Sequence, residues 1–218
     1  MSAPMQDLLA ILDLEQLEHN LFRGRSPDTS WQRVFGGQTV AQALVAAQRT
    51  VESGRHVHSL HGYFMLGGDP KVPIVYEVDR IRDGGSFTTR RVVAIQHGKA
   101  IFSLEASFQG DETGLEHQKP APRNVPRPET LPTQQEIIAR YGDAIPNSIL
   151  RYWERERPIE MRPVALDHYT SRDKLAPEQH IWIRFVADMP ADRDIRSALL
   201  AYVSDITLLD TSTFAHGR

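Results

Sequence analysis

The sequence has no cysteine, little net charge and no long apolar run, and each lack excludes a class of function. Without cysteine there is no disulfide, no thiol nucleophile and no zinc–thiolate site, as in proteins of a reducing compartment. A formal net charge of −3 indicates neither nucleic acid nor an anionic membrane as a partner. No apolar run is long enough to cross a bilayer. We therefore expect a cytoplasmic protein that binds neither nucleic acid nor membrane.

The N-terminus lacks the pattern of a secretory signal. No basic region precedes its apolar residues, and Asp7 and Asp13 interrupt them. Leu8, Leu9 and Leu12 instead recur at helical spacing, which predicts an amphipathic helix.

Further on, small residues predict a buried helix. Gly36 and Gly37 precede a segment in which Val40, Leu44 and Ala47 share one helical face. The remaining positions carry little bulk, so other structure can pack closely around this helix. The backbone N–H groups at its start favour an anion or a polarised carbonyl oxygen, although glycine also serves wherever the backbone passes close to a neighbour.

From His56 onward the apolar residues recur with a period of two, which predicts strands. The predicted strands are 57–66, 74–82, 87–96 and 100–109. Short turns at Asp83–Gly85 and His97–Gly98 make the strands that they join antiparallel neighbours. We expect a long antiparallel meander, strongly curved around the small-residue helix.

Between Lys119 and Thr133 the chain has five prolines and no apolar periodicity. Proline fixes φ and cannot donate to a strand ladder, so this segment is expected to be an extended linker. Beyond it we predict helices at 134–141 and 146–157, strands at 159–164 and 180–187, and a long helix at 191–209. This predicts three parts: an N-terminal unit at 1–110, a linker with helices at 111–157, and the start of a second unit at 158–218.

The last predicted helix has no strands after it. An apolar helix without a sheet would leave a large exposed hydrophobic surface. Either a partner covers that surface, or the chain lacks its C-terminal sheet, and we favour the second because a segment of about 65 residues does not easily close its own core.

Asp205 lies in the middle of this apolar helix. A carboxylate among aliphatic residues loses hydration, which costs several kcal/mol unless it is hydrogen-bonded, protonated or used in chemistry. It is therefore either a catalytic base with a raised pKa or a structural carboxylate that is hydrogen-bonded to nearby backbone or to a hydroxyl such as that of Ser204 or Thr207.

Three nearby histidines invite a metal interpretation that the strand pattern opposes. Alternation puts His56 and His58 on one face of the strand and His61 on the other, so three ligands do not converge. We expect no metal site.

A series of ordered motifs resembles the bacterial acyl-CoA thioesterase II family. The motifs run over essentially the whole chain: LFRGRS, VFGGQTVAQAL, VHSLHGYFMLGGD, RDGGSFTTRRVVAIQHGKAIF, ASFQ, LEHQ, HIWIR and LAYVSD. The resemblance implies an α+β double hotdog fold, with a curved antiparallel sheet around a central helix in each unit and a second unit that is incomplete here. It also implies hydrolysis of fatty acyl-CoA to the free acid and coenzyme A, without metal or organic cofactor, by a homo-oligomer.

The resemblance also assigns residues. Asp205 matches the family's aspartate, which positions a water together with a threonine or serine and a glutamine. Those two partners are expected beyond the end of this sequence. His58 is expected to border the acyl channel or to donate to the substrate, or else to be an ordinary strand histidine. From its place at the helix N-terminus, and not from the resemblance, Gly37 is the candidate donor to the substrate oxygen.

The basic residues Arg80, Arg82, Arg90 and Arg91 fall across one predicted hairpin. They are either a contact for coenzyme A phosphates or a solvated sheet face, and we favour the solvated face.

Two alternatives to hydrolysis remain. A hotdog hydratase would pair Asp205 with His58 on one acyl chain. A non-catalytic fragment would bind acyl-CoA, or only assemble with partners, for want of the downstream residues. Release of free thiol from acyl-CoA separates hydrolysis from both.

Overall fold

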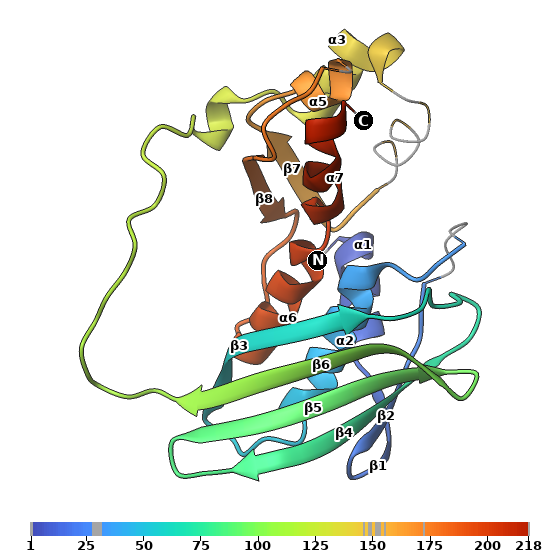
Figure 1. The fold of residues 1–218 in the computed structure, drawn as a ribbon, viewed down its shortest axis with the longest axis vertical. Coiled ribbons are helices and arrows are strands. Elements are labelled where there is room, and N and C mark those ends of the chain that lie inside the picture. Colours follow the sequence, from blue (N-terminus) through green and yellow to red (C-terminus); the bar gives the residue numbers. More distant parts are fainter. Residues whose placement is uncertain are drawn as a thin grey trace. The chain divides into compact units, whose positions relative to one another are not determined.

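The predicted small-residue helix and antiparallel sheet are present in the computed structural model of the chain (Figure 1). The structure describes residues 2–27, 32–145, 147, 150, 154, 156–171 and 173–217. Two compact units are distinguished. The sheet unit comprises Asp7–Gly114 and Met189–Ile206, and the hairpin unit comprises Met1–Gln6, Leu115–Asp188 and Thr207–Arg218. The helix α1 (Ala3–Leu12) contains the boundary between them.

The sheet unit contains a six-stranded antiparallel sheet in the order β1-β2-β4-β5-β6-β3. Its elements are β1 (Glu15–Glu18), β2 (Leu21–Gly24), α2 (Gly36–Gln48), β3 (Arg55–Phe64), β4 (Ile74–Asp83), β5 (Phe87–Gln96), β6 (Lys99–Gly110) and α6 (Arg193–Ser204). The bounds of β5 agree with the prediction. The tight turn between β5 and β6 is also confirmed, with positive φ at His97 and Gly98.

The prediction of a simple meander is wrong for β3. This strand pairs with β6 at the edge of the sheet, and β4 pairs with β5 and β2 instead. The turns after β4 and β5 are short, which keeps those strands adjacent. The connection at 65–73 is longer than a hairpin turn and takes the chain to the other side of β5 and β6.

The core lies between the sheet and α2, as the small residues predict. Every residue from Gly37 to Ala47 is buried, and α2 contacts each strand from β2 to β6. On β6 the alternate residues Phe102, Leu104, Ala106 and Phe108 are buried, whereas Ser103, Glu105 and Ser107 between them are not. The first set therefore faces α2. Helix α6 also packs against α2 within this unit.

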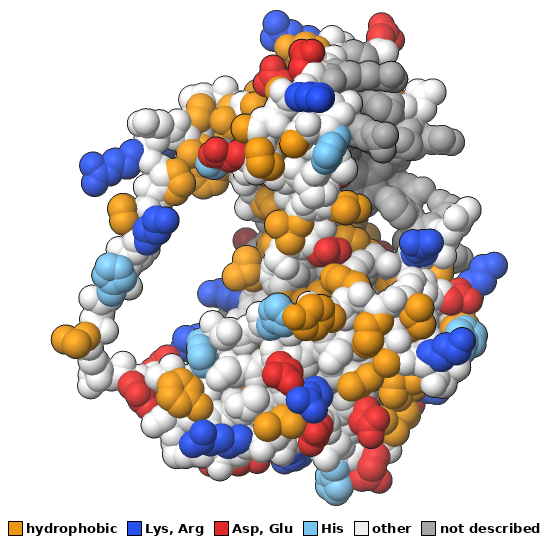
Figure 2. Space-filling model, in the orientation of Figure 1, with side chains coloured by type: hydrophobic (Ala, Val, Ile, Leu, Met, Phe, Trp, Pro, Cys, Tyr) orange, Lys and Arg blue, Asp and Glu red, His pale blue; other side chains and the backbone are white. Residues whose placement is uncertain are grey.

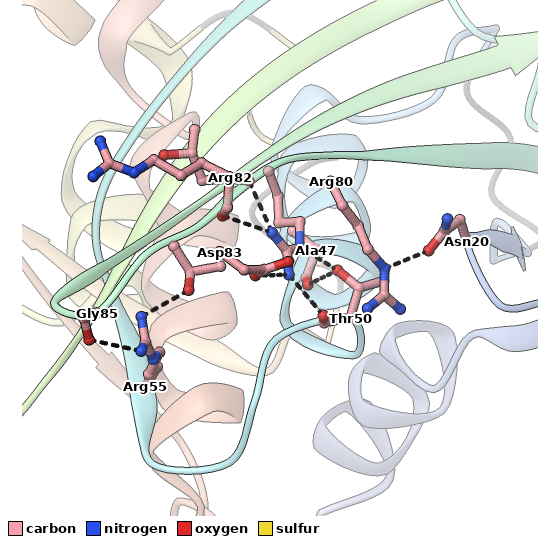
Figure 3. Close-up of polar contacts among 11 residues, drawn as sticks. Asn20, Ala47, Thr50, Arg55, Arg80, Arg82, Asp83 and Gly85 are labelled. Atoms are coloured by element: carbon pink, nitrogen blue, oxygen red, sulfur yellow. Dashed lines mark hydrogen bonds and ion pairs between the residues drawn. The ribbon is translucent and has the colours of Figure 1, made fainter.

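Arg90 is not part of a solvated face. Its side chain is 1% exposed because Arg90 lies opposite the buried Ala106 and so points to the core side of the sheet. Nε donates to the Thr50 hydroxyl at 2.9 Å and Nη2 to the Thr50 carbonyl at 3.0 Å. The remaining donors reach the carbonyls of Arg82 and Thr89 and the Asp83 carboxylate at 2.6 Å (Figure 3). All five N–H groups are used, and they tie the end of α2 to the β4–β5 turn.

Replacing Arg90 with methionine should lower the free energy of unfolding by about 2–3 kcal/mol, because buried carbonyls and a hydroxyl lose their donors. Chemical denaturation followed by circular dichroism measures this. Arg91→Met is the matched control: Arg91 forms an exposed ion pair with Glu105, so its loss should change stability little. Equal effects of the two substitutions would contradict the buried role of Arg90.

The hairpin unit is built around β7 (Ile159–Pro163) and β8 (Ile181–Phe185), which pair antiparallel. It also contains α3 (Gln134–Tyr141), α5 (Asp167–Thr170) and α7 (Leu208–Thr213), with short 3₁₀ turns at Pro128–Thr130, Gly142–Ala144 and Phe214–His216. The predicted helix 134–141 is confirmed, and a Thr133–Glu136 capping box begins it. The predicted helix 146–157 falls largely outside the described residues.

The proline-rich segment is held at its C-terminal end by a cross-strand pair of the hairpin unit. Arg162 and Trp182 face each other across β7 and β8. Trp182 Nε1 donates to the Pro126 carbonyl at 2.9 Å, and Arg162 donates to the carbonyls of Pro128 and Leu131. Residues 111–127 contain neither helix nor strand, but the 3₁₀ turn at Pro128–Thr130 interrupts the extended linker predicted between Lys119 and Thr133.

In the hairpin unit, burial lowers the pKa of His168 to about 4 from an ordinary 6.5, although the Asp167 carboxylate partly opposes this. The folded protein therefore favours neutral His168. Its contribution to stability is complete above pH 6.5 and is lost as the pH falls from there toward 4. Ring NMR titration should show protonation of His168 only near pH 4.

His168→Phe keeps an aromatic ring beside Tyr169 and Phe214 and should remove this part of the pH dependence. Titration of His168 at its ordinary pKa would contradict the burial effect.

Candidate active site

Asp205 lies at the end of a helix, which corrects the prediction of one long helix at 191–209. Helix α6 ends at Ser204, Asp205 is its C-terminal cap residue, and α7 begins only at Leu208. A carboxylate at a helix C-terminus opposes the negative end of the helix dipole, and Asp and Thr compete for backbone hydrogen bonds. The residues at 205–207 therefore favour a break.

The Asp205 carboxylate lies at the start of α2. The backbone N–H of Gly37, in the first turn of α2, donates a hydrogen bond to it. At the other end of the same helix, Gln48 Nε2 donates to the backbone carbonyl of Asp194 in the first turn of α6, at 3.0 Å. The two helices thus run antiparallel, and the positive end of the α2 dipole faces the carboxylate. The partner of Asp205 is thus a backbone N–H and not Ser204, whose hydroxyl donates to the Ala201 carbonyl.

Two opposing effects act on the Asp205 carboxyl. Partial burial raises its pKa above the ordinary 3.8, and the hydrogen bond from Gly37 lowers it in part. Burial is the larger effect, so the net direction is upward. A carboxylate with a raised pKa accepts a proton more readily near neutral pH, which is the property that a general base requires.

Apolar side chains lie beside this carboxylate. The Phe64 ring approaches the backbone at Gly36, is 54% exposed, and packs on Phe102 with ring centroids 4.8 Å apart. Tyr63, Met65 and Leu66, its neighbours in the chain, are exposed too. Figure 2 shows hydrophobic side chains at the surface of the sheet unit among charged ones. No sequence pattern singles out Phe64, because its place beside Gly36 depends on the β3–β6 pairing.

His58 lies on the other face of the sheet from α2. A β-bulge falls between Val57 and Ser59, so His58 has no residue opposite it on β6. Its Nε2 is 2.9 Å from the hydroxyl of Ser107, and its ring lies against Phe87. The prediction that His58 and His61 point to opposite faces is therefore wrong, since the bulge puts His58 beside Ser107 on the face that His61 shares.

The structure thus brings Gly37 and Asp205 together and leaves His58 on a separate surface. The pairing of Asp205 with His58 that a hydratase requires is not formed. A contact of His58 with the substrate stays a prediction, as does donation from Gly37 to a substrate oxygen, since the Gly37 N–H is bonded to Asp205 here.

His56, the first of the three histidines, contacts α6. Its Nδ1 is 2.8 Å from the carboxylate of Asp194, in the first turn of that helix. Within the described part of the chain, no group of three or more His, Cys, Asp or Glu residues is arranged to hold a metal ion. The described residues also include no helix long and apolar enough to cross a membrane.

The fold and the site together define a hotdog-type protein with a carboxylate at the N-terminus of its central helix. Comparisons with known proteins agree. Residues 26–109 match the family model "Acyl-CoA thioesterase N-terminal domain", and residues 151–218 match "Acyl-CoA thioesterase". Acyl-CoA thioesterase 2 of Haemophilus influenzae is 38% identical over 218 residues, which is all of this chain and 76% of the relative.

Comparisons with solved structures also indicate a hotdog-fold thioesterase. The crystal structure of acyl-CoA thioesterase II TesB2 from Mycobacterium marinum has a TM-score of 0.72 and 40% identity, covering 96% of this chain and 71% of that one. A hotdog-fold protein from Alicyclobacillus acidocaldarius has a TM-score of 0.69 at 18% identity, covering 94% and 72%, and shows the fold alone. The chain belongs to the acyl-CoA thioesterase family, as its motifs predict.

The raised pKa of Asp205 has a consequence for stability. The folded protein favours the protonated form, so ionisation costs stability as the pH rises from below 3.8. Asparagine is neutral at every pH and can still accept the Gly37 hydrogen bond. Asp205→Asn should therefore be more stable than the wild type near neutral pH, and the difference should vanish below pH 3.8. Chemical denaturation across this range measures it, and a less stable variant near neutral pH would contradict the burial effect.

Proposed function

We propose that this protein hydrolyses fatty acyl-CoA thioesters to free fatty acid and coenzyme A, with Asp205 as the group that orients and deprotonates the attacking water. The observation that carries the proposal is the partly buried Asp205 carboxylate, held by the Gly37 N–H at the start of α2 beside the exposed Phe64. The relatives are named acyl-CoA thioesterases, which supports the substrate class.

The chemistry needs little more than a positioned water. A thioester carbonyl is less stabilised by resonance than an ester, so an oriented water with a general base can attack it. The water oxygen forms a bond to the carbonyl carbon, and its proton passes to Asp205. The carbon–sulfur bond then breaks, and the coenzyme A sulfur leaves and takes up the proton that Asp205 had accepted, which returns Asp205 to its ionised form. The positive end of the α2 dipole suits the oxygen that becomes negative during attack.

The apolar residues at the end of β3 suit the acyl chain. Phe64 exposes apolar surface next to the site, Met65 and Leu66 after it are exposed too, and burying such surface under a fatty chain is favourable. Because β3 is also an edge strand of the sheet, we further propose that copies of the protein associate, which would cover this edge. The proposed compartment is the cytoplasm.

Asp205→Asn should lower the turnover of acyl-CoA by about 10²- to 10⁴-fold, because the general base is lost while its shape is kept. Release of free thiol from a fatty acyl-CoA by the natural protein measures this. Asp210→Asn is the matched control, since burial also raises the pKa of Asp210 but that residue lies in α7. Its turnover should stay near that of the wild type.

Undiminished thiol release by Asp205→Asn would remove Asp205 from the mechanism. Tight binding of acyl-CoA by the wild-type protein without any thiol release would favour the non-catalytic alternative.

A further inference from the structure

We propose that Gly36 is a positioning residue for Asp205: the absence of a side chain at residue 36 leaves the space in which the Asp205 carboxylate lies against the first turn of α2. This inference rests on the proposed function, in which that carboxylate handles the attacking water. It assigns to the first glycine of the pair a role different from that of the second.

The space at Gly36 is filled by side-chain ends. A Cβ on Gly36 would overlap Oδ2 of Asp205 and would lie only 2.9 Å from Cζ of Phe64. Cβ atoms do not approach heavy atoms so closely, so something must move. Both contacts are the ends of side chains that can rotate, and the backbone is not among them. A methyl group at residue 36 therefore displaces the carboxylate and the ring while leaving the helices in place.

The space at Gly37 is different, because backbone fills it. A Cβ there would overlap the carbonyl oxygen of Tyr202 in α6 and would approach the Phe35 ring to 2.5 Å. The Phe35 ring in turn packs edge-on against the Tyr202 ring, with centroids 5.0 Å apart. Gly37 thus sets how closely the backbones of α2 and α6 approach, whereas Gly36 sets where the carboxylate lies once they have done so.

The backbone at Gly36 gives no other reason for glycine. Gly36 is the first residue of α2, and it is not among the glycines with positive φ. Alanine also favours a helix more than glycine does. Gly36→Ala should consequently fold as well as the wild type, and its defect should be confined to the carboxylate and the Phe64 ring.

The test compares three glycine substitutions in the natural protein. Gly36→Ala should lower kcat at least about tenfold, because a small misplacement of a reacting group is costly, with a thermal midpoint like that of the wild type. Gly37→Ala should lower the thermal midpoint. Gly85→Ala should change neither, because a Cβ there has no heavy atom within 4 Å. Unchanged kcat in Gly36→Ala would overturn the proposal.

A titration separates positioning from general damage. In Gly36→Ala the carboxylate moves off the Gly37 N–H, which changes both its burial, the larger effect on its pKa, and the hydrogen bond that lowers its pKa. Carbon-13 NMR should therefore find a pKa of the Asp205 carboxyl that differs from that in the wild type, whereas Gly85→Ala should leave it unchanged. An unchanged pKa in Gly36→Ala would overturn the proposal. Because this titration needs no turnover, it tests the position of Asp205 even if Asp205→Asn proves active and the proposed function fails.

The double variant Gly36→Ala/Phe64→Leu distinguishes the effect of displacing the Asp205 carboxylate from that of displacing the Phe64 ring. Leucine at residue 64 lacks the ring atoms that would overlap a Cβ on residue 36, so only the overlap of that Cβ with Asp205 remains. A kcat that stays low in the double variant supports the proposal. Recovery of kcat to the level of Phe64→Leu alone would assign the defect to the displaced ring and overturn it.

Discussion

The close antiparallel packing of α2 and α6 is the constraint on which the candidate site depends. It puts the start of one helix beside the end of the other, so the Gly37 N–H meets the Asp205 carboxylate. The close packing is possible because Gly37 of α2 has no side chain where it meets the backbone carbonyl of Tyr202 in α6. Larger residues would separate the backbones and take the carboxylate away from its donor.

The sheet fixes the position of α2, on which the contact between Gly37 and Asp205 depends. Alternate residues of β6 pack on the helix, and Arg90 fixes the loop after it with two hydrogen bonds to Thr50. The other helix is fixed at its start, where His56 and Gln48 bond to Asp194. Each helix is therefore anchored far from the carboxylate. At the site itself, the Gly37 N–H and the space left by Gly36 and Gly37 are enough to hold Asp205.

Asp205 is a compromise between stability and reactivity. The C-terminal end of α6 and partial burial both disfavour its charge, while the N-terminal end of α2 favours it. A carboxylate whose negative charge is fully stabilised by hydrogen-bond donors would be a weaker base. One whose charge is not stabilised at all would stay protonated or disrupt the helix end. The geometry leaves the carboxyl between these limits, beside apolar surface that suits a fatty chain.

The sequence by itself determined the local elements: the strand at 87–96, the turn at His97 and Gly98, the burial of the small-residue helix, and the unusual cost of a carboxylate at residue 205. These follow from periodicity, backbone preferences and hydration, which act over a few residues. Only the tertiary structure decided the place of β3 beside β6, the bulge that turns His58 to the outer face, the burial of Arg90, and the bond from Gly37 to Asp205. Those depend on register and packing between residues far apart in the chain, and no local pattern carries that information.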